Sequence, residues 1–356
     1  MNGDSFIIPA GTGLLYDVVV LRNTATGVLS VPSGKNWTVP PLLNTLEIRG
    51  RLQFATTFDG VTAGAGEEIW LELQAQKIFN RNGEFFIHGG WDETNNKFSP
   101  YPTGVTASIV FRGRYGDVSM AFTNEVEGGN KILINAGNVT FVGSPLTTRT
   151  KGRLYETLAV GATTAKISKD SLDINGDISG KQAWGFAAGI NITIAGTDMS
   201  DYQSEQFTIT GTPDTSNADY DVVTLDHAAV YRHIGGPETM AQMPCDNLST
   251  RRVDFRAEVT SWNKNIRLSG SNQENIYSPL APYHVVTDNN TDWGCTVLHS
   301  SYKEVDPSDP TNLALQTFYF SESLMKDVQM YNCSQRDTSK AFVRFEGANF
   351  DKNLIN

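Results

Sequence analysis

The sequence predicts an all-β protein, mainly a right-handed parallel β-helix (a solenoid) with a β-rich N-terminal portion. Three observations support this fold class. Short segments alternate apolar and polar side chains with the period of two that is typical of strands. Glycine recurs after several of these segments, at uneven intervals that are about 24 residues in the middle of the chain, near the length of one solenoid turn. No long segment has the helical period with capping residues. A two-sheet sandwich with long loops is the alternative.

The N-terminal part carries the clearest strand pattern. A Pro-Ala-Gly turn at residues 9–11 separates two short apolar runs. Residues 46–54 alternate so that four apolar side chains would share one strand face, and residues 69–74 repeat the alternation. Glycine at strand ends would allow backbone angles that other residues avoid. These glycines are Gly50, Gly89, Gly113, Gly137 and Gly270.

Further strands are expected in the second half of the chain. Residues 190–194, 207–210 and 222–225 alternate in the same way. Residues 271–312 are rich in Asn, Asp, Ser and Pro, and we expect them to form a long loop on the β scaffold. Long loops of this kind often carry binding functions.

Several linked motifs resemble chains that carry a G-eight (eight-glycine) domain, such as hyaluronan-degrading cell-surface proteins and fibrocystin-like proteins. The first is an Ile-Pro-Ala-Gly run at residues 8–11, followed by Leu-x-Ile-x-Gly-x-Leu-x-Phe at residues 46–54. A tryptophan-led segment from Trp184 then reaches a Thr-Asp pair, a Gln-x-Glu step and a His-Ile-Gly ending at residues 233–235. Asp-Phe-Arg-Ala-Glu-Val at residues 254–259 resembles the next motif of the family.

The predicted division of the chain follows from this resemblance and from composition. It comprises a G-eight-like domain in residues 1–150, a β-rich segment with β-helix rungs in 151–270, the polar loop excursion in 271–312, and further β-helix strands and a tail in 313–356.

Charge and composition exclude some classes of partner. The chain has 356 residues, a formal net charge of −11 and a pI of about 5.0. No basic stripe offsets the acidic residues, which argues against nucleic acid and against an anionic membrane surface. No apolar run is long enough to span a bilayer. The expected partners are an extracellular glycan or neighbouring protein subunits.

Cysteines and glycosylation motifs bear on the compartment. The three cysteines, Cys245, Cys295 and Cys333, fit one disulfide with one free thiol or three thiols. Together with the resemblance, Asn-x-Ser/Thr motifs favour an extracellular or cell-surface location. Residues 1–20 lack the features of a signal peptide, so we expect either a processed or excised N-terminus or a chain that is not secreted by the usual route. The motifs begin at Asn36, Asn138, Asn191, Asn247, Asn289 and Asn332.

The first candidate catalytic group is an acid–base–acid ladder. At period two, Asp254, Arg256 and Glu258 would share one strand face, with Phe255 and Ala257 on the other. Two nearby carboxyl groups suit glycoside hydrolysis, in which one donates a proton and the other acts as base or nucleophile. The alternative interpretation is a surface ladder of opposite charges that stabilises the strand.

Other candidates lie just before this ladder. His233 could move a proton, although a single histidine at a strand end is often structural. Asp198, Asp201 and Glu205, with Arg232, form a candidate ligand-binding set on loops. Calcium is the one cofactor considered for these oxygens, although no EF-hand pattern is present. No histidine or cysteine spacing indicates another metal site.

The chain departs from the family's hyaluronan-degrading members near its end. Arg344 and Glu346 stand where those members have histidines, and the Gly-Gly-His step is missing. The sequence therefore favours a non-catalytic extracellular module that binds carbohydrate or builds an assembly. The alternatives are a hyaluronidase-type glycosidase that uses Asp254, Arg256, Glu258 and His233, and a viral or phage-like β-helical fibre.

Overall fold

The structure of the protein is a computed structural model in which most of the chain is described. The described residues are 4–23, 29–32, 42–113, 120–121, 127–172, 178–197, 203–236, 240–242, 252–271, 294–304, 308, 312, 317–335 and 341–347.

The described residues form β-strands and no α-helix, which confirms the all-β prediction. None of them forms a helix that could cross a membrane. The chain divides into two compact units. The first unit combines residues 1–144 and 264–356, and the second consists of residues 145–263.

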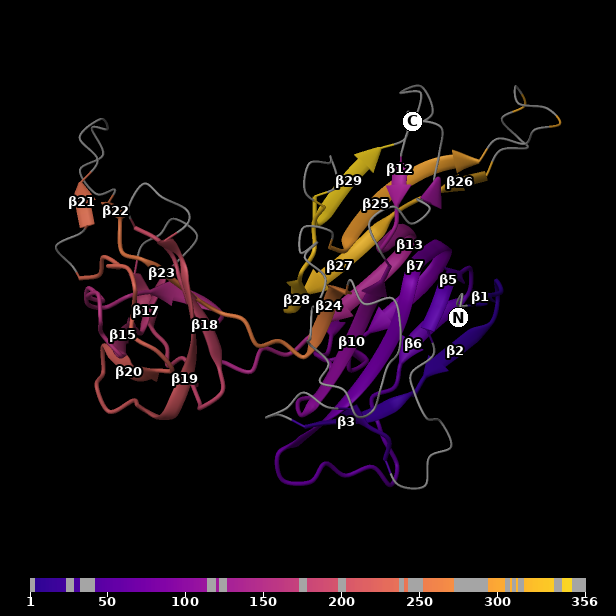
Figure 1. The fold of residues 1–356 in the computed structure, drawn as a ribbon. Helices are drawn as coiled ribbons and strands as arrows, with labels where there is room; N and C mark the ends of the chain where they lie inside the picture. The colour runs from indigo at the N-terminus through magenta and orange to yellow at the C-terminus, as the bar shows by residue number, and fades with distance from the viewer. Residues whose placement is uncertain are drawn as a thin grey trace. The chain divides into compact units, whose positions relative to one another are not determined.

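The first unit contains a 15-stranded, curled sheet and two small hairpins (Figure 1). Its strands are β1 (Asp4–Ile8), β2 (Gly13–Tyr16), β3 (Val19–Asn23), β4 (Leu29–Ser30), β5 (Leu42–Ile48), β6 (Arg51–Phe54), β7 (Glu67–Ile87), β8 (Trp91–Asp92), β9 (Lys97–Phe98), β10 (Val105–Arg112), β11 (Met120–Ala121), β12 (Glu127–Gly129), β13 (Ile132–Val142), β24 (Ile266–Ser271), β25 (Thr296–Glu304), β26 (Thr317–Tyr319), β27 (Glu322–Lys326), β28 (Val328–Tyr331) and β29 (Val343–Gly347).

Strand β7 is the centre of this sheet. It has 21 residues and pairs in parallel with β5, β6, β10 and β13, and antiparallel with β3. Because parallel strands in register place equivalent positions side by side, inward side chains form apolar rows. One such row is Leu52, Phe85 and Val139, all of which are buried.

Glycine is required where the strand-to-strand turns approach each other closely. A Cβ atom on Gly50 would lie 2.2 Å from the carbonyl oxygen of Thr12, and one on Gly83 would lie 2.6 Å from that of Ile48. Real side chains do not tolerate such contacts, so these turns can only pack when both positions lack a side chain.

A row of polar side chains runs through the interior of the same sheet. Asn80 and Asn135 are register partners, and the Asn80 Nδ2 atom donates to the Asn135 Oδ1 atom over 2.8 Å. Asn135 is in turn the register partner of His299, with 3.3 Å between Asn135 Nδ2 and His299 Nδ1. Burial lowers the pKa of His299 to about 4.

The predicted right-handed parallel β-helix is wrong. The first unit is a curled sheet in which one long strand, β7, serves several partners, and β3, β4 and β26 pair antiparallel. The glycine interval did not mark a repeat. Strand β10 pairs with residues 69–75 of β7, whereas β13 pairs with residues 77–87. Alternation predicts strands, but it does not determine which partner each strand finds.

The second unit is antiparallel throughout its six-stranded sheet, in the order β14-β23-β18-β19-β20-β15. Its core surrounds the fully buried Trp184, which stacks on Phe186. The strands of this unit are β14 (Lys151–Arg153), β15 (Thr164–Ser168), β16 (Asp170–Leu172), β17 (Ile178–Lys181), β18 (Asn191–Ile194), β19 (Glu205–Asp214), β20 (Tyr220–Leu225), β21 (Met240–Gln242), β22 (Arg252–Asp254) and β23 (Glu258–Ser261).

Two of the three cysteines form a disulfide in the first unit. Cys295, which precedes β25, is bonded to Cys333, which follows β28. The bond links segments 38 residues apart in the sequence. Cys245 lies outside the described residues.

Candidate functional site

The predicted acid–base–acid ladder does not lie on one strand face. Strand β22 ends at Asp254 and β23 begins at Glu258. The Asp254 carboxylate accepts a hydrogen bond from the backbone N–H of Arg256 over 3.0 Å, and this local turn replaces the strand. The expected opposite face is also divided, because Phe255 is 56% exposed while Ala257 is buried.

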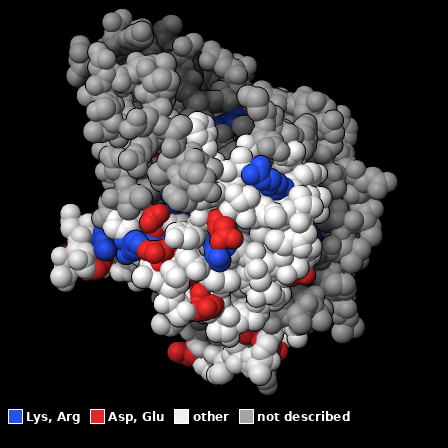
Figure 2. Space-filling model, turned by 90° about the vertical axis from the view of Figure 1, so that its left-hand side faces the viewer, with Lys and Arg blue, Asp and Glu red and all other residues white. Residues whose placement is uncertain are grey.

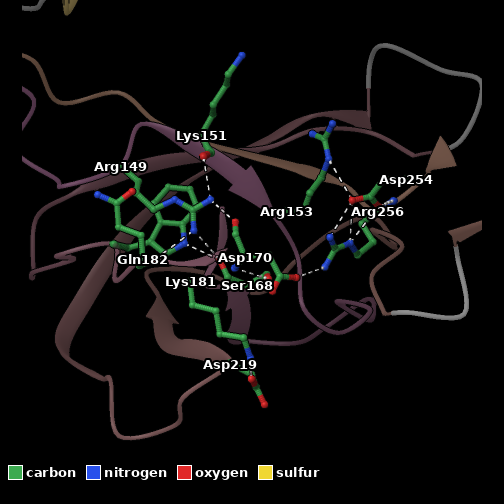
Figure 3. Close-up of polar contacts among 11 residues, drawn as sticks. Arg149, Lys151, Arg153, Ser168, Asp170, Lys181, Gln182, Asp219, Asp254 and Arg256 are labelled. Carbon is green, nitrogen blue, oxygen red and sulfur yellow. Dashed lines mark hydrogen bonds and ion pairs between the residues drawn. The ribbon is translucent and has the colours of Figure 1, made fainter. Parts of the chain in front are cut away.

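The tertiary fold nevertheless gathers these charges into one network (Figure 3). The Arg256 side chain donates hydrogen bonds to Asp254, with Nε–Oδ1 and Nη2–Oδ2 distances of 2.9 and 2.8 Å. Its Nη1 atom lies 3.2 Å from Oδ2 of Asp170 in β16. From β14, Arg153 also points toward Asp254, and its Nη1 atom donates to Glu258 over 2.7 Å. Five charged side chains from four strands or their ends therefore form one connected network of ion pairs.

The network holds the Asp254 carboxylate in the ionised form. Burial alone would raise the pKa of the Asp254 carboxyl, but hydrogen bonds and the positive charge of Arg256 outweigh it and lower the pKa. Arg256 is itself buried, yet Asp254 and Asp170 raise the pKa of its guanidinium. An acid that must donate a proton at neutral pH needs a raised pKa, so Asp254 is unsuited to that role.

A third arginine, beside this network, was not predicted as a site residue. Arg149 lies over the Trp184 ring, 4.9 Å from its centroid, and donates to backbone carbonyls that include those of Asp170 and Ser168. Figure 3 shows its guanidinium pointing at these backbone oxygens. The sequence offers no signal for this contact, because the acceptors are carbonyl groups brought together by folding.

His233 and Glu205 form a separate buried pair in the second unit. His233 is fully buried, and its Nε2 atom lies 2.7 Å from the Glu205 Oε2 atom. Its Nδ1 atom lies 2.9 Å from the carbonyl oxygen of Ala195 and must donate there, because a carbonyl only accepts. Backbone N–H groups of Val230 and Tyr231 donate to the same carboxylate.

This arrangement makes Glu205 a structural anchor for the chain that follows β20. Burial would raise the pKa of its carboxyl, but the backbone hydrogen bonds and His233 together lower it. All four contacts are internal, and neither side chain reaches solvent to any useful extent. His233 and Glu205 therefore hold the chain after β20 in place. This is a structural role, the alternative that the sequence left open for His233.

The remaining predicted ligand residues are Arg232, Asp198 and Asp201. Arg232 is exposed, and Asp198 and Asp201 lie outside the described residues. Among the residues whose placement is described, no group of three His, Cys, Asp or Glu side chains could hold a metal ion.

The glycosylation motifs fall in different settings. Asn138 is half-buried within β13, and its Oδ1 atom accepts from the hydroxyl of Thr140. Asn191 is exposed at the start of β18 and accepts from Thr208, whereas Asn332 donates to the carbonyl oxygen of Gly270. Asn36, Asn247 and Asn289 lie outside the described residues.

An open polar groove in the first unit was not predicted as a site. It has a volume of about 430 Å³ and lies over three stacked turns whose close packing requires glycine. Arg49 and Arg51 flank it and are 44% and 54% exposed. Their Nε atoms pair with Glu47 and Glu84, and each guanidinium has four further N–H groups. The lining residues are Gly11, Thr12, Gly13, Arg49, Gly50, Arg51, Asn82, Gly83 and Glu84.

A row of aromatic rings leads away from this groove. The Arg51 guanidinium lies 5.4 Å from the ring centroid of Phe86, which contacts His88. His88 contacts Phe98, and Phe98 makes an edge-to-face contact with Trp91 at 4.9 Å. Trp91 is 47% exposed, so the row ends in an accessible indole ring. A glycine-rich turn beside alternating aromatics is the sequence signal that could have indicated this surface.

Elsewhere the charges are mixed. On the face drawn in Figure 2, acidic side chains lie beside basic ones in places and others are scattered, without a large area of one sign among the described residues.

No family model and no curated protein matches the chain. The resemblance to G-eight chains accordingly stays a prediction based on its motifs.

Proposed function

We propose that this protein is a non-catalytic, extracellular carbohydrate-binding module, and that it binds glycan along the groove of the first unit. The observation that carries the proposal is the groove itself, in which the arginines flank a floor of glycine turns. Guanidinium groups bind hydroxyl and carboxylate oxygens with several hydrogen bonds at once. A glycine floor lets an extended ligand approach the backbone closely.

The aromatic row supports the same proposal. Sugar rings have an apolar face that packs on aromatic side chains, and Trp91 presents about half of its surface to solvent next to Phe98. Polar groups that orient a ligand and an aromatic surface that packs on it are the usual components of a binding site. Glu84 and Phe86 lie on the side of β7 opposite to the core residue Phe85, and Phe86 is itself buried there.

The predicted catalytic residues favour binding over hydrolysis. Asp254 is held by two hydrogen bonds to the Arg256 side chain, and His233 is enclosed by Glu205 and Ala195. Glu258 is the one of the four that is substantially exposed, and it is paired with Arg153. A glycosidase needs a protonated acid and a second carboxylate that both face the substrate.

An extracellular location is part of the proposal. Disulfides persist in oxidising compartments, and the Cys295–Cys333 bond fits such a location. The exposed Asn191 motif is the described position where a glycan attachment site would be accessible.

Binding can be tested with size-defined hyaluronan, chondroitin sulfate and a neutral glycan, with and without calcium. Bound fraction and fragment length are both measured. We expect binding without shortening, and an increase in Kd of about tenfold or more, equivalent to about 1.4 kcal/mol, for the double variant Arg49→Ala/Arg51→Ala and for Trp91→Ala. Lys166→Ala, at an exposed lysine of the second unit, is the matched control and should leave Kd unchanged.

The other outcomes decide against the proposal. Shortened glycan would identify an enzyme, and Glu258→Gln would then be the first variant to examine. Binding that survives all three groove and aromatic substitutions would place the site elsewhere. Absence of binding to every glycan would reject carbohydrate recognition and leave assembly as the function to test.

A further inference from the structure

Among the described strands, the two parallel pairing paths of the first unit each end in a strand that pairs on one side. One pairing path runs β1-β5-β7-β13-β25-β29, and a neighbouring path runs β2-β6-β7-β13-β27. Within the described part of the chain, β1 and β2 each pair on one side alone, as do β27 and β29. Each edge thus offers two adjacent strands with backbone groups available for another strand.

Both edges expose apolar side chains that equivalent positions inside the sheet bury. Phe6 and Leu14 are 46% and 38% exposed, although their register partners Leu46 and Leu52 are buried. At the other edge Leu324 and Phe345 are 44% and 75% exposed. Apolar residues gathered on sheet edges mark surfaces that pair with another chain.

The two edges match each other in register. Tracing partners along the second path, Leu15 is equivalent to Gln53, Phe86, Thr140 and finally Leu324. One position further, Tyr16 is equivalent to Met325, and continuing the same register places Asp17 against Lys326. Along the first path, Phe6 is equivalent to Val343.

We propose that copies of this chain associate head to tail, with β1 and β2 of one copy pairing in parallel with β29 and β27 of the next. The register sets Leu15 on Leu324, Phe6 on Val343, and Asp17 beside Lys326, which brings apolar side chains together and opposite charges into contact. All strands of both edges run parallel within their paths, so the added copy continues the ladder that already exists. This inference does not depend on glycan binding.

Such contacts have a defined symmetry. The surface on one copy differs from the surface that it meets, so the interaction does not close on itself in a dimer and can add further copies. Association is therefore expected to increase with protein concentration and to yield a series of species, as sedimentation velocity can measure.

Mixed cysteine variants test the orientation directly. Leu15→Cys and Leu324→Cys are prepared separately in a background where Cys245 is replaced by Ser, then mixed under mild oxidation. We expect a disulfide-linked dimer in the mixture and little in either variant alone. Val160→Cys, at an exposed position of the second unit, replaces Leu15→Cys in the control mixture and should not cross-link.

A charge exchange tests the register without cysteines. Lys326→Glu should weaken association about tenfold by placing two acids together, and Asp17→Lys should act similarly. The double variant Asp17→Lys/Lys326→Glu should recover association to within about twofold. Circular dichroism of each variant verifies folding.

A parent chain that stays monomeric up to about 0.5 mM, well above the range of weak specific contacts, would overturn the proposal. Cross-linking of Leu15→Cys to itself, rather than to Leu324→Cys, would also overturn it, because that result requires a two-fold contact.

Discussion

One buried polar arrangement in the first unit differs in kind from two in the second. In the parallel sheet of the first unit, the interior polar row consists of Asn80, Asn135 and His299. Burial lowers the pKa of His299 and so favours its neutral form. In the antiparallel second unit, Glu205 is buried against His233, and Lys169 forms a buried ion pair with Asp221. The first unit also buries charged side chains, such as Glu72, Lys131 and Arg112, but its Asn80–Asn135–His299 row contains none of them.

Strand direction and register explain the difference. Parallel strands in register place equivalent positions next to each other, so a charge repeated along a row would meet its own sign. An asparagine can donate to one neighbour and accept from the other, and a row of amides therefore satisfies itself. In the second unit, turns and strand ends bring unrelated positions together, and opposite charges can be paired there.

The largest expected effect is on the glycine turns of the first unit. A Cβ atom on Gly83 would meet the carbonyl oxygens of Ile48 and Gly50 at 2.6 and 2.7 Å. We expect Gly83→Ala to lower the free energy of unfolding of this unit by about 4 kcal/mol or more. Chemical denaturation with amide hydrogen exchange measures the loss and assigns it to a unit.

Gly13→Ala is the matched control, because a Cβ atom there has no neighbour within 4 Å and the backbone angle is ordinary. It should change the free energy of unfolding by less than about 1 kcal/mol. Equal losses for the two variants would mean that close turn packing does not hold the first unit together.

A somewhat smaller effect is expected from breaking the buried pair of the second unit. Glu205→Gln keeps the shape but turns an amide N–H₂ toward donors that include the backbone N–H groups of Val230 and Tyr231. We expect a loss of about 3 kcal/mol in the free energy of unfolding, seen as faster exchange in β19 and β20. Glu258→Gln, at a 43% exposed carboxylate, should cost about 1 kcal/mol or less. If both variants lose the same amount, the pair is not an anchor.

The smallest expected effect is the change of stability with pH, which should differ between the two units. The folded pKa of His299 is about 4, below the unfolded value of about 6.5, so the unfolded chain binds a proton first as pH falls. Stability of the first unit should therefore decrease between pH 6.5 and 4, by about 2 to 3 kcal/mol. His299→Asn would extend the amide row and should remove the larger part of this dependence; the rest comes from His88, whose pKa is lowered by burial.

The second unit should respond at lower pH. The pKa values of Glu205 and Asp254 are lowered in the fold, so their contributions are complete above the ordinary carboxyl range and are lost as pH falls through the lowered values. Hydrogen exchange as a function of pH distinguishes the two windows. Loss of both units in a single window would contradict the distinction between them.

Sequence reasoning located strands well because alternation depends on local burial. Ile190, Ile192 and Ile194 are buried in or next to β18, and Phe207 and Ile209 are buried in β19, as their period predicts. The same reasoning failed for Asp254, Arg256 and Glu258, because the carboxylate of Asp254 binds the backbone of Arg256 and ends the strand. Here a local side-chain-to-backbone hydrogen bond replaces the strand pairing that the alternation predicted.

The sequence by itself determined the all-β class, many of the strand positions and the small residues needed at tight turns. It missed β25, which lies within residues 271–312 where a long loop was predicted. Side-chain periodicity and glycine carry that information locally. The tertiary structure alone decided that one long strand serves several partners, that residues 145–263 pair antiparallel, and that Arg153 and Asp170 join Asp254 and Arg256. It also decided where the groove lies. Partners distant in sequence are chosen by burial and register over the whole chain, and no local pattern records that choice.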